Sequence, residues 1–114
     1  VRNARQEQAQ VSYRKAVLTG LQDVEDAVAR VDGDRKEAAR LEEALGTAGR
    51  AEEIARTRYR GGLVTLSDVL IAEARRIQLE EQLIETRGAE ARDTVALVKA
   101  LGGGWTDENT ETQQ

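Results

Sequence analysis

The chain has 114 residues, 39% of them apolar and 33% charged, with a net charge of −4 and no Pro, Cys, Met, His or Phe. The absence of His and Cys excludes the common zinc and iron sites and nucleophilic thiols. Mixed charges with an acidic balance argue against nucleic acid as a partner, and no apolar run approaches the roughly 20 residues of a membrane-spanning helix.

Residues 2–60 are predicted to form one long helix. Its apolar residues recur at helical spacing in two series, first Leu18, Leu21, Val24, Val28 and Val31, then Ala38, Leu41, Leu45, Ala48, Ala55 and Tyr59. Spacings of three and four in the second series are typical of a helix–helix seam. The series meet at Gly33, and a lone Gly costs only about 1 kcal/mol against Ala. We therefore expect continuity, with a turn at Gly33 and a three-helix bundle as the alternative.

Residues 61–65 are predicted to form a tight turn. Gly61 or Gly62 can adopt the left-handed conformation that closes a helix. The stretch from Thr65 to Asp68 fits the capping-box pattern, with Thr65 as N-cap and Ser67 as its rival. The chain therefore stops one helix and starts another here.

Residues 66–101 are predicted to form the second helix. Leu70, Ile77, Ile84, Ala91 and Val98 follow one another at intervals of seven, and we interpret this row, widened by Leu66, Ala74, Leu83 and Val95, as its apolar face. We assign the charged residues, Arg76 and Glu80 among them, to solvated outer faces. Gly102–Gly104 should end the helix, and the polar residues 106–114 should be disordered.

These elements predict an all-α fold, a long antiparallel coiled-coil hairpin with arms of unequal length. About 25 residues of the first arm have no partner in the second, since both helices rise ~1.5 Å per residue. The apolar side chains there need cover from another copy, from a missing part of the protein or from a fold-back at Gly33. We expect a piece of a longer protein that self-associates, and neither an enzyme nor a cofactor or metal site.

The turn carries a resemblance to a known family. Tyr59-x-x-Gly62-x-x-Thr65-Leu66-x-Asp68-Val69-Leu70 resembles the second-repeat tip of the TolC-like outer-membrane efflux factors. Residues 95–105, VALVKALGGGW, resemble the C-terminal end common in the NodT-type lipoprotein branch. Residues 13–27 resemble the start of the long helix that descends from the β-barrel. The resemblance spans residues 1–105.

The resemblance implies a function in transport. Members are trimers, with an outer-membrane barrel and a helical tunnel in the periplasm. Residues 1–105 would be a periplasmic hairpin of that tunnel, a passive conduit in a tripartite, RND-type export system. Its partners would be further copies, a periplasmic adaptor and, indirectly, an inner-membrane pump. The residues alone leave an alternative open: a structural coiled-coil adaptor or tether hairpin that mediates assembly only.

The resemblance also implies roles for residues of the tip. Tyr59 and Asp68 match positions of the constriction at the tunnel entrance, where three copies of Asp68 would form a carboxylate ring that favours cations. The chain departs from the best-known pattern at Val64 and Ile71, where some members carry a basic and a second acidic residue. That ion-pair latch is therefore not expected here.

Residues Gly61, Gly62, Leu63, Val64 and Thr65 match the end of the hairpin that meets the adaptor. Structural explanations stand beside these roles. An acid in the first helical turn stabilises the helix dipole, a Tyr at the end of a seam packs against it, and Gly62 serves backbone geometry.

Overall fold

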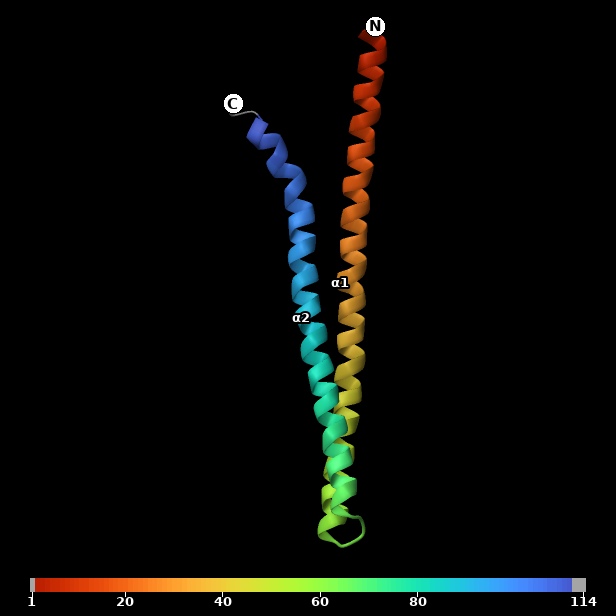
Figure 1. The fold of residues 1–114 in the computed structure, drawn as a ribbon, viewed down its shortest axis with the longest axis vertical. Coiled ribbons are helices and arrows are strands. Elements are labelled where there is room, and N and C mark those ends of the chain that lie inside the picture. The colour runs from red at the N-terminus through yellow and green to blue at the C-terminus, as the bar shows by residue number, and fades with distance from the viewer. Residues whose placement is uncertain (1, 112–114) are drawn as a thin grey trace. The chain divides into compact units, whose positions relative to one another are not determined.

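The computed structural model describes the backbone of residues 2–111 and the side chains of residues 3–102. Two helices, α1 (Arg2–Arg60) and α2 (Leu66–Glu111), are joined by a short turn (Figure 1). This confirms the all-α helical hairpin. The chain divides into two compact units, residues 33–91 and residues 1–32 with 92–114. Each is described by itself.

Helix α1 is continuous through Gly33, as the sequence favours, so the three-helix alternative is wrong. The reason is local. Gly33 has helical geometry with nothing within 4 Å of where a Cβ would stand, and no proline interrupts the stretch. A glycine lowers helix propensity without forbidding helical dihedral angles.

The turn ends α1 through its backbone. Gly62 has a φ of 75°, which a residue without a Cβ adopts at no steric cost. Leu63 N donates to the carbonyl of Arg58 at 2.8 Å, and Gly62 N donates to that of Tyr59 at 3.0 Å. This pair of bonds is a Schellman motif, which satisfies carbonyls that the helix end leaves free. Of the two glycines expected, Gly62 is the left-handed one.

Helix α2 starts with the expected capping box. The Thr65 hydroxyl accepts a bond from Asp68 N at 3.4 Å, while Asp68 Oδ2 accepts bonds from Thr65 N at 3.1 Å and Thr65 Oγ1 at 3.0 Å. These reciprocal bonds satisfy backbone donors of the first helical turn. Thr65, not Ser67, is the N-cap.

The core of the unit 33–91 lies between the two antiparallel helices. Ala38, Leu41 and Ala48 of α1 form one buried cluster with Leu79 and Leu83 of α2. The second series expected for α1 is thus confirmed from Ala38 to Ala48, whereas Ala55 is half buried and Tyr59 keeps 44% of its surface exposed. Small Ala side chains let the helix backbones approach closely, so the core is a thin seam.

The apolar face expected for α2 does not pack on α1, except for Leu83, one of the residues expected to widen it. Leu70, Ile77 and Ile84 are exposed, and the seam is formed by the buried Val69, Leu79 and Leu83. Arg76 occupies the seam position seven residues from both Val69 and Leu83. The expectation was wrong because a charged residue in the true seam conceals its period, whereas the exposed row repeats without interruption.

The end of α2 also differs from the expectation. Its helical backbone runs through Gly102–Gly104 to Glu111, ten residues beyond Leu101, so these glycines do not end it. Three glycines weaken a helix but, without a proline, leave the helical conformation open. Residues 106–111 have a helical backbone and residues 112–114 lie outside the described part, so the disorder expected for residues 106–114 stays a prediction.

In the other unit, the first part of α1 is exposed. Every described side chain from 3 to 23 is exposed, and burial begins only with Ala27 and Val31. The exposed apolar side chains of this stretch include Val11, Tyr13, Val17, Leu18 and Leu21. This agrees with the expectation that the apolar stripe at the start of the first helix lacks cover.

Candidate functional site

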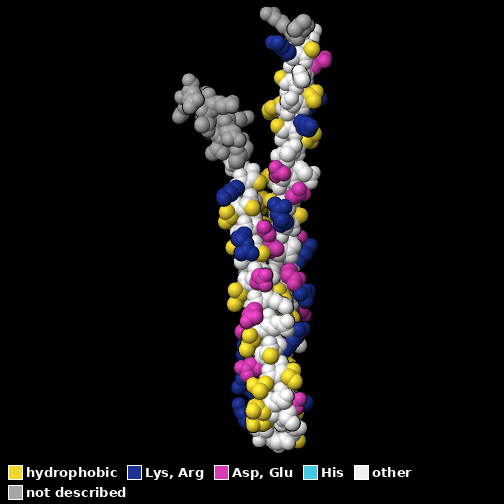
Figure 2. All heavy atoms as spheres, viewed as in Figure 1, with side chains coloured by type: hydrophobic (Ala, Val, Ile, Leu, Met, Phe, Trp, Pro, Cys, Tyr) yellow, Lys and Arg dark blue, Asp and Glu magenta, His cyan; other side chains and the backbone are white. Residues whose placement is uncertain are grey.

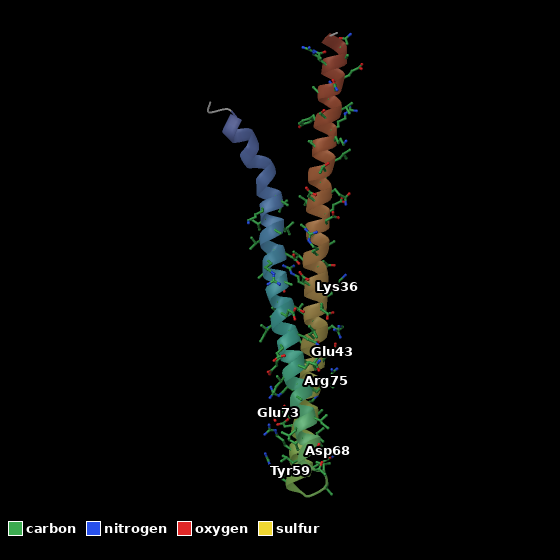
Figure 3. The ribbon with its side chains drawn as sticks, viewed as in Figure 1. Lys36, Glu43, Tyr59, Asp68, Glu73 and Arg75 are labelled. Atoms are coloured by element: carbon green, nitrogen blue, oxygen red, sulfur yellow. The ribbon has the colours of Figure 1, made fainter. Side chains whose placement is uncertain are left out.

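The two predicted entrance residues lie on either side of the turn. Tyr59 belongs to the last turn of α1 and Asp68 to the first turn of α2, and Figure 3 shows both beside the connecting loop. The Tyr59 carbonyl closes α1, while its side chain is half exposed. The fold therefore brings both residues to the same end of the hairpin.

Asp68 uses one carboxylate oxygen for hydrogen bonds within the turn, and its other oxygen is available to accept further bonds. Both of its side-chain hydrogen bonds use Oδ2, and among the described residues no hydrogen bond engages Oδ1. The residue is exposed. Its carboxylate can therefore cap the helix and still meet water or a cation.

The bend presents apolar surface to solvent. Leu63 is 78% exposed and Leu66 is 51% exposed, while Val64 is half buried. Figure 2 shows hydrophobic side chains gathered near the turn. An apolar bend of this kind is suited to contact with a protein partner.

One cluster was not predicted from the sequence, and it is formed by Glu52, Arg56, Arg76 and Glu80. Arg76 was expected on a solvated outer face, but it lies at the contact between the helices. Glu52 keeps 7% of its surface exposed and is the only charged residue buried among residues 3–102. Its carboxylate accepts bonds from Arg56, at 2.9 and 3.2 Å, and from Arg76 of the other helix. Arg76 also donates to Glu80 at 2.8 Å. We call this set the polar clamp.

The clamp changes the acid–base properties of its members. The hydrogen bond from Arg76 holds the pKa of the Glu52 carboxyl below its ordinary value, against the opposing effect of burial. The same bond raises the pKa of Arg76. Both groups are therefore charged near neutral pH. The sequence does contain an indication of this cluster. Glu52 lies seven residues from both Leu45 and Tyr59, so a charged residue occupies a position of the apolar series of α1.

Further ion pairs join the helices at their edges. Arg35 contacts Glu90 at 3.2 Å, Glu42 contacts Arg87, and Arg56 reaches Glu73 at 3.9 Å. The pairs follow one another toward the turn, with rising numbers in α1 and falling numbers in α2. They show that one antiparallel register holds along the unit. Exposed pairs of this kind contribute little stability.

A second apolar row of α2 faces solvent. Leu70 is 54% exposed, Ile77 is 40% exposed and Ile84 is 72% exposed, all at intervals of seven. Glu81 and Glu85 lie beside this row. A seven-residue apolar period is the pattern that packs one helix along another. Helix α2 thus has one seam inside the hairpin and a second that remains open.

The described residues contain neither a membrane-spanning helix nor a cluster of metal ligands. No described helix is both long enough and apolar enough to cross a membrane. No group of three or more Asp and Glu side chains within the described part is arranged to hold a metal ion.

Comparison with known proteins gives a consistent result. The profile of the family described as "Outer membrane efflux protein" matches residues 1–103. The chain is 35% identical over 102 residues to the pyoverdine export outer membrane protein OpmQ of Pseudomonas aeruginosa, covering 90% of this chain and 22% of OpmQ. It is 29% identical over 101 residues to the cation efflux system protein CusC of Escherichia coli, covering 89% of this chain and 22% of CusC.

A third relative is also an outer membrane protein. The outer membrane protein OprJ of Pseudomonas aeruginosa is 29% identical over 102 residues, which cover 90% of this chain and 21% of OprJ. No solved structure gives a significant match. The chain thus spans about a fifth of the length of these relatives.

Proposed function

Because the chain belongs to the outer membrane efflux protein family, we propose that its hairpin is a segment of the periplasmic tunnel of a trimeric outer-membrane efflux channel. In this proposal the chain is part of a longer protein of the outer membrane, and the hairpin itself lies in the periplasm. It conducts passively in a tripartite system, with a periplasmic adaptor and an inner-membrane pump that supplies the energy.

The open apolar row of α2 carries this proposal. A hairpin that served only as a spacer would need one seam, between its own helices. Here Leu70, Ile77 and Ile84 repeat at intervals of seven on a face that stays largely exposed to solvent in the unit 33–91. A tunnel wall made of side-by-side hairpins requires such a second seam on each of them, because every hairpin must pack against a neighbour as well as against itself.

The turn is the proposed periplasmic entrance. Tyr59 and Asp68 would line it, and three Asp68 carboxylates would face one another in the trimer. Residues Gly61–Thr65 would form the adaptor-docking end, where the exposed Leu63 offers apolar contact. The alternative of an adaptor hairpin is less well supported, since the family and the relatives above are outer membrane efflux proteins.

A substitution in the open row tests the proposal. Ile84→Glu in the longer protein should abolish trimer assembly and export, because it places a charge in the seam between hairpins. It should leave the hairpin itself folded, since Ile84 is 72% exposed there. Assembly is measured by native gel electrophoresis of the detergent-extracted protein, and export by drug or siderophore accumulation.

The matched control is Gln82→Glu, which adds the same charge at an exposed position of the same helix. It should assemble and export normally. Normal trimers and normal export from Ile84→Glu would show that the row is not a packing seam and would remove the main support for the tunnel.

A further inference from the structure

A buried carboxylate, that of Glu52, lies in the seam of the unit 33–91. Glu52 is held there by Arg76 of the opposite helix and by Arg56 of its own, and Arg76 is held in turn by Glu80. Arg76 is itself only partly exposed. A buried charge is tolerated where it is paired and hydrogen-bonded, and is costly where it is not.

The two partners occupy equivalent positions in a repeating pattern. In α1, Glu52 stands seven residues from Leu45 and from Tyr59. In α2, Arg76 stands seven residues from Val69 and from Leu83. The apolar residues of such a repeat look alike from one heptad to the next, and α1 contributes small Ala side chains that fit many partners. Apolar contacts therefore discriminate poorly between registers that differ by seven residues.

The ion pair does discriminate between them. In a hairpin displaced by one heptad, the carboxylate of Glu52 would be buried against Val69 or Leu83 and would lose its cross-helix partner. A polar pair at one seam position is an established way to specify the register of a coiled coil. The edge pair Arg35–Glu90 cannot do the same, because solvent is available to both of its groups when they separate.

The clamp also marks where the core ends. The buried cluster of Ala38, Leu41, Ala48, Leu79 and Leu83 lies on the side away from the turn. Between residues 53 and 75, all of which are described, Val69 is the only buried side chain. The helix ends that carry Tyr59 and Asp68 therefore have little apolar packing of their own, and the clamp lies between the buried cluster and the turn.

We propose that Glu52 and Arg76 are positioning residues, whose buried ion pair fixes the register of α1 against α2 and thereby places Tyr59 and Asp68 at the turn. The importance of that placement rests on the proposed function. The register itself is a property of the hairpin, so the experiment below does not depend on export.

The test measures the register directly. The chain has no Cys, so cysteines placed at the exposed Thr57 and Ile71 can be spin-labelled uniquely, and their separation is read by pulsed electron resonance. Dilution with unlabelled chain suppresses distances between molecules. The variants are Glu52→Gln, the double variant Glu52→Leu/Arg76→Leu, and the control Glu37→Gln, which removes an exposed pair with Arg40 within α1.

The unsubstituted chain and Glu37→Gln should give one narrow distance distribution. The double leucine variant should fold at least as stably, because an apolar pair of similar size replaces the buried charges. Its distribution should nevertheless contain a second population, with the helices displaced along their axes by about 10 Å, the length of seven helical residues. Glu52→Gln should broaden the distribution and lower the midpoint of thermal unfolding.

The double leucine variant decides the matter. A single narrow distribution at the original distance would show that the turn alone sets the register, and would overturn the proposal. The same outcome would leave the tunnel proposal untouched, whereas failure of the Ile84→Glu test would leave the register result valid.

Discussion

At the scale of single residues, two glycines have opposite effects because of one dihedral angle. Gly62 has a φ of 75°, while Gly49 is helical, and neither has an atom within 4 Å of a new Cβ. Gly62→Ala should lower the free energy of unfolding by about 1 kcal/mol, the cost of a left-handed alanine. Gly49→Ala should raise it by roughly 0.5–1 kcal/mol. Urea unfolding followed by circular dichroism checks both, and equal signs would contradict the assignment of the turn.

The turn was predictable from sequence because its chemistry is local. Gly62 and Thr65 act within a few residues of their own positions, so the sequence places the two helix ends that flank the turn correctly. The roles of Tyr59 and Asp68 are of another kind. Their positions at the turn are confirmed, but what they face in an assembly depends on further copies, so their entrance role stays a proposal.

At the scale of the helical elements, the polar clamp makes the hairpin sensitive to acid. The pKa of Glu52 is lowered on folding, chiefly by its hydrogen bond from Arg76, and that of Glu37 is lowered by Arg40. Each group thus binds a proton less readily in the folded state. The stability they contribute is complete above the ordinary Glu pKa of about 4.3 and is lost as the pH falls through the lower folded values.

Thermal unfolding between pH 7 and pH 2.5 checks this expectation. The midpoint temperature of unfolding should decrease once the pH is below about 4. The decrease should be smaller in Glu52→Gln, which has no carboxyl to protonate at that position. An equally steep fall in that variant would assign the acid sensitivity to other groups. Glu37→Gln should reduce the fall less, because its exposed pair can be replaced by water.

The seams of the two helices differ in how well sequence reveals them. The seam of α1 is mostly Ala and Leu, and its period predicts the buried face correctly. The seam of α2 contains Arg76 between Val69 and Leu83, so its period is broken, while the exposed row of Leu70, Ile77 and Ile84 is regular. The more regular pattern therefore indicated the wrong face, because an apolar period predicts a packing surface without identifying the element that packs against it.

At the scale of the whole molecule, the exposed row of Leu70, Ile77 and Ile84 is not explained by the packing of the hairpin alone. One apolar period serves the contact within the unit, and the second is left for contacts outside it. Together with the exposed Leu18 and Leu21 at the start of α1, it agrees with a chain that completes its packing only in an assembly. Family membership adds the kind of assembly proposed, a tunnel of hairpins whose turns meet at its entrance.

In that assembly the charge of Asp68 should affect the passage of ions through the channel. Three carboxylates in a ring attract divalent cations, which bind there and hinder conduction. Asp68→Asn should weaken the block of channel conductance by divalent cations in planar bilayers. The Asn side-chain oxygen can still accept the bonds from Thr65 that now go to Asp68 Oδ2, so the turn should keep its shape.

Glu85→Gln is the matched control, since it removes an exposed carboxylate of the same helix away from the turn. It should leave the block unchanged. If Asp68→Asn were blocked as strongly as the unsubstituted channel, Asp68 would be a helix cap and nothing more. Its function would then be limited to the two hydrogen bonds that Asp68 Oδ2 accepts from Thr65 in the hairpin. The entrance constriction would have to be formed by other residues.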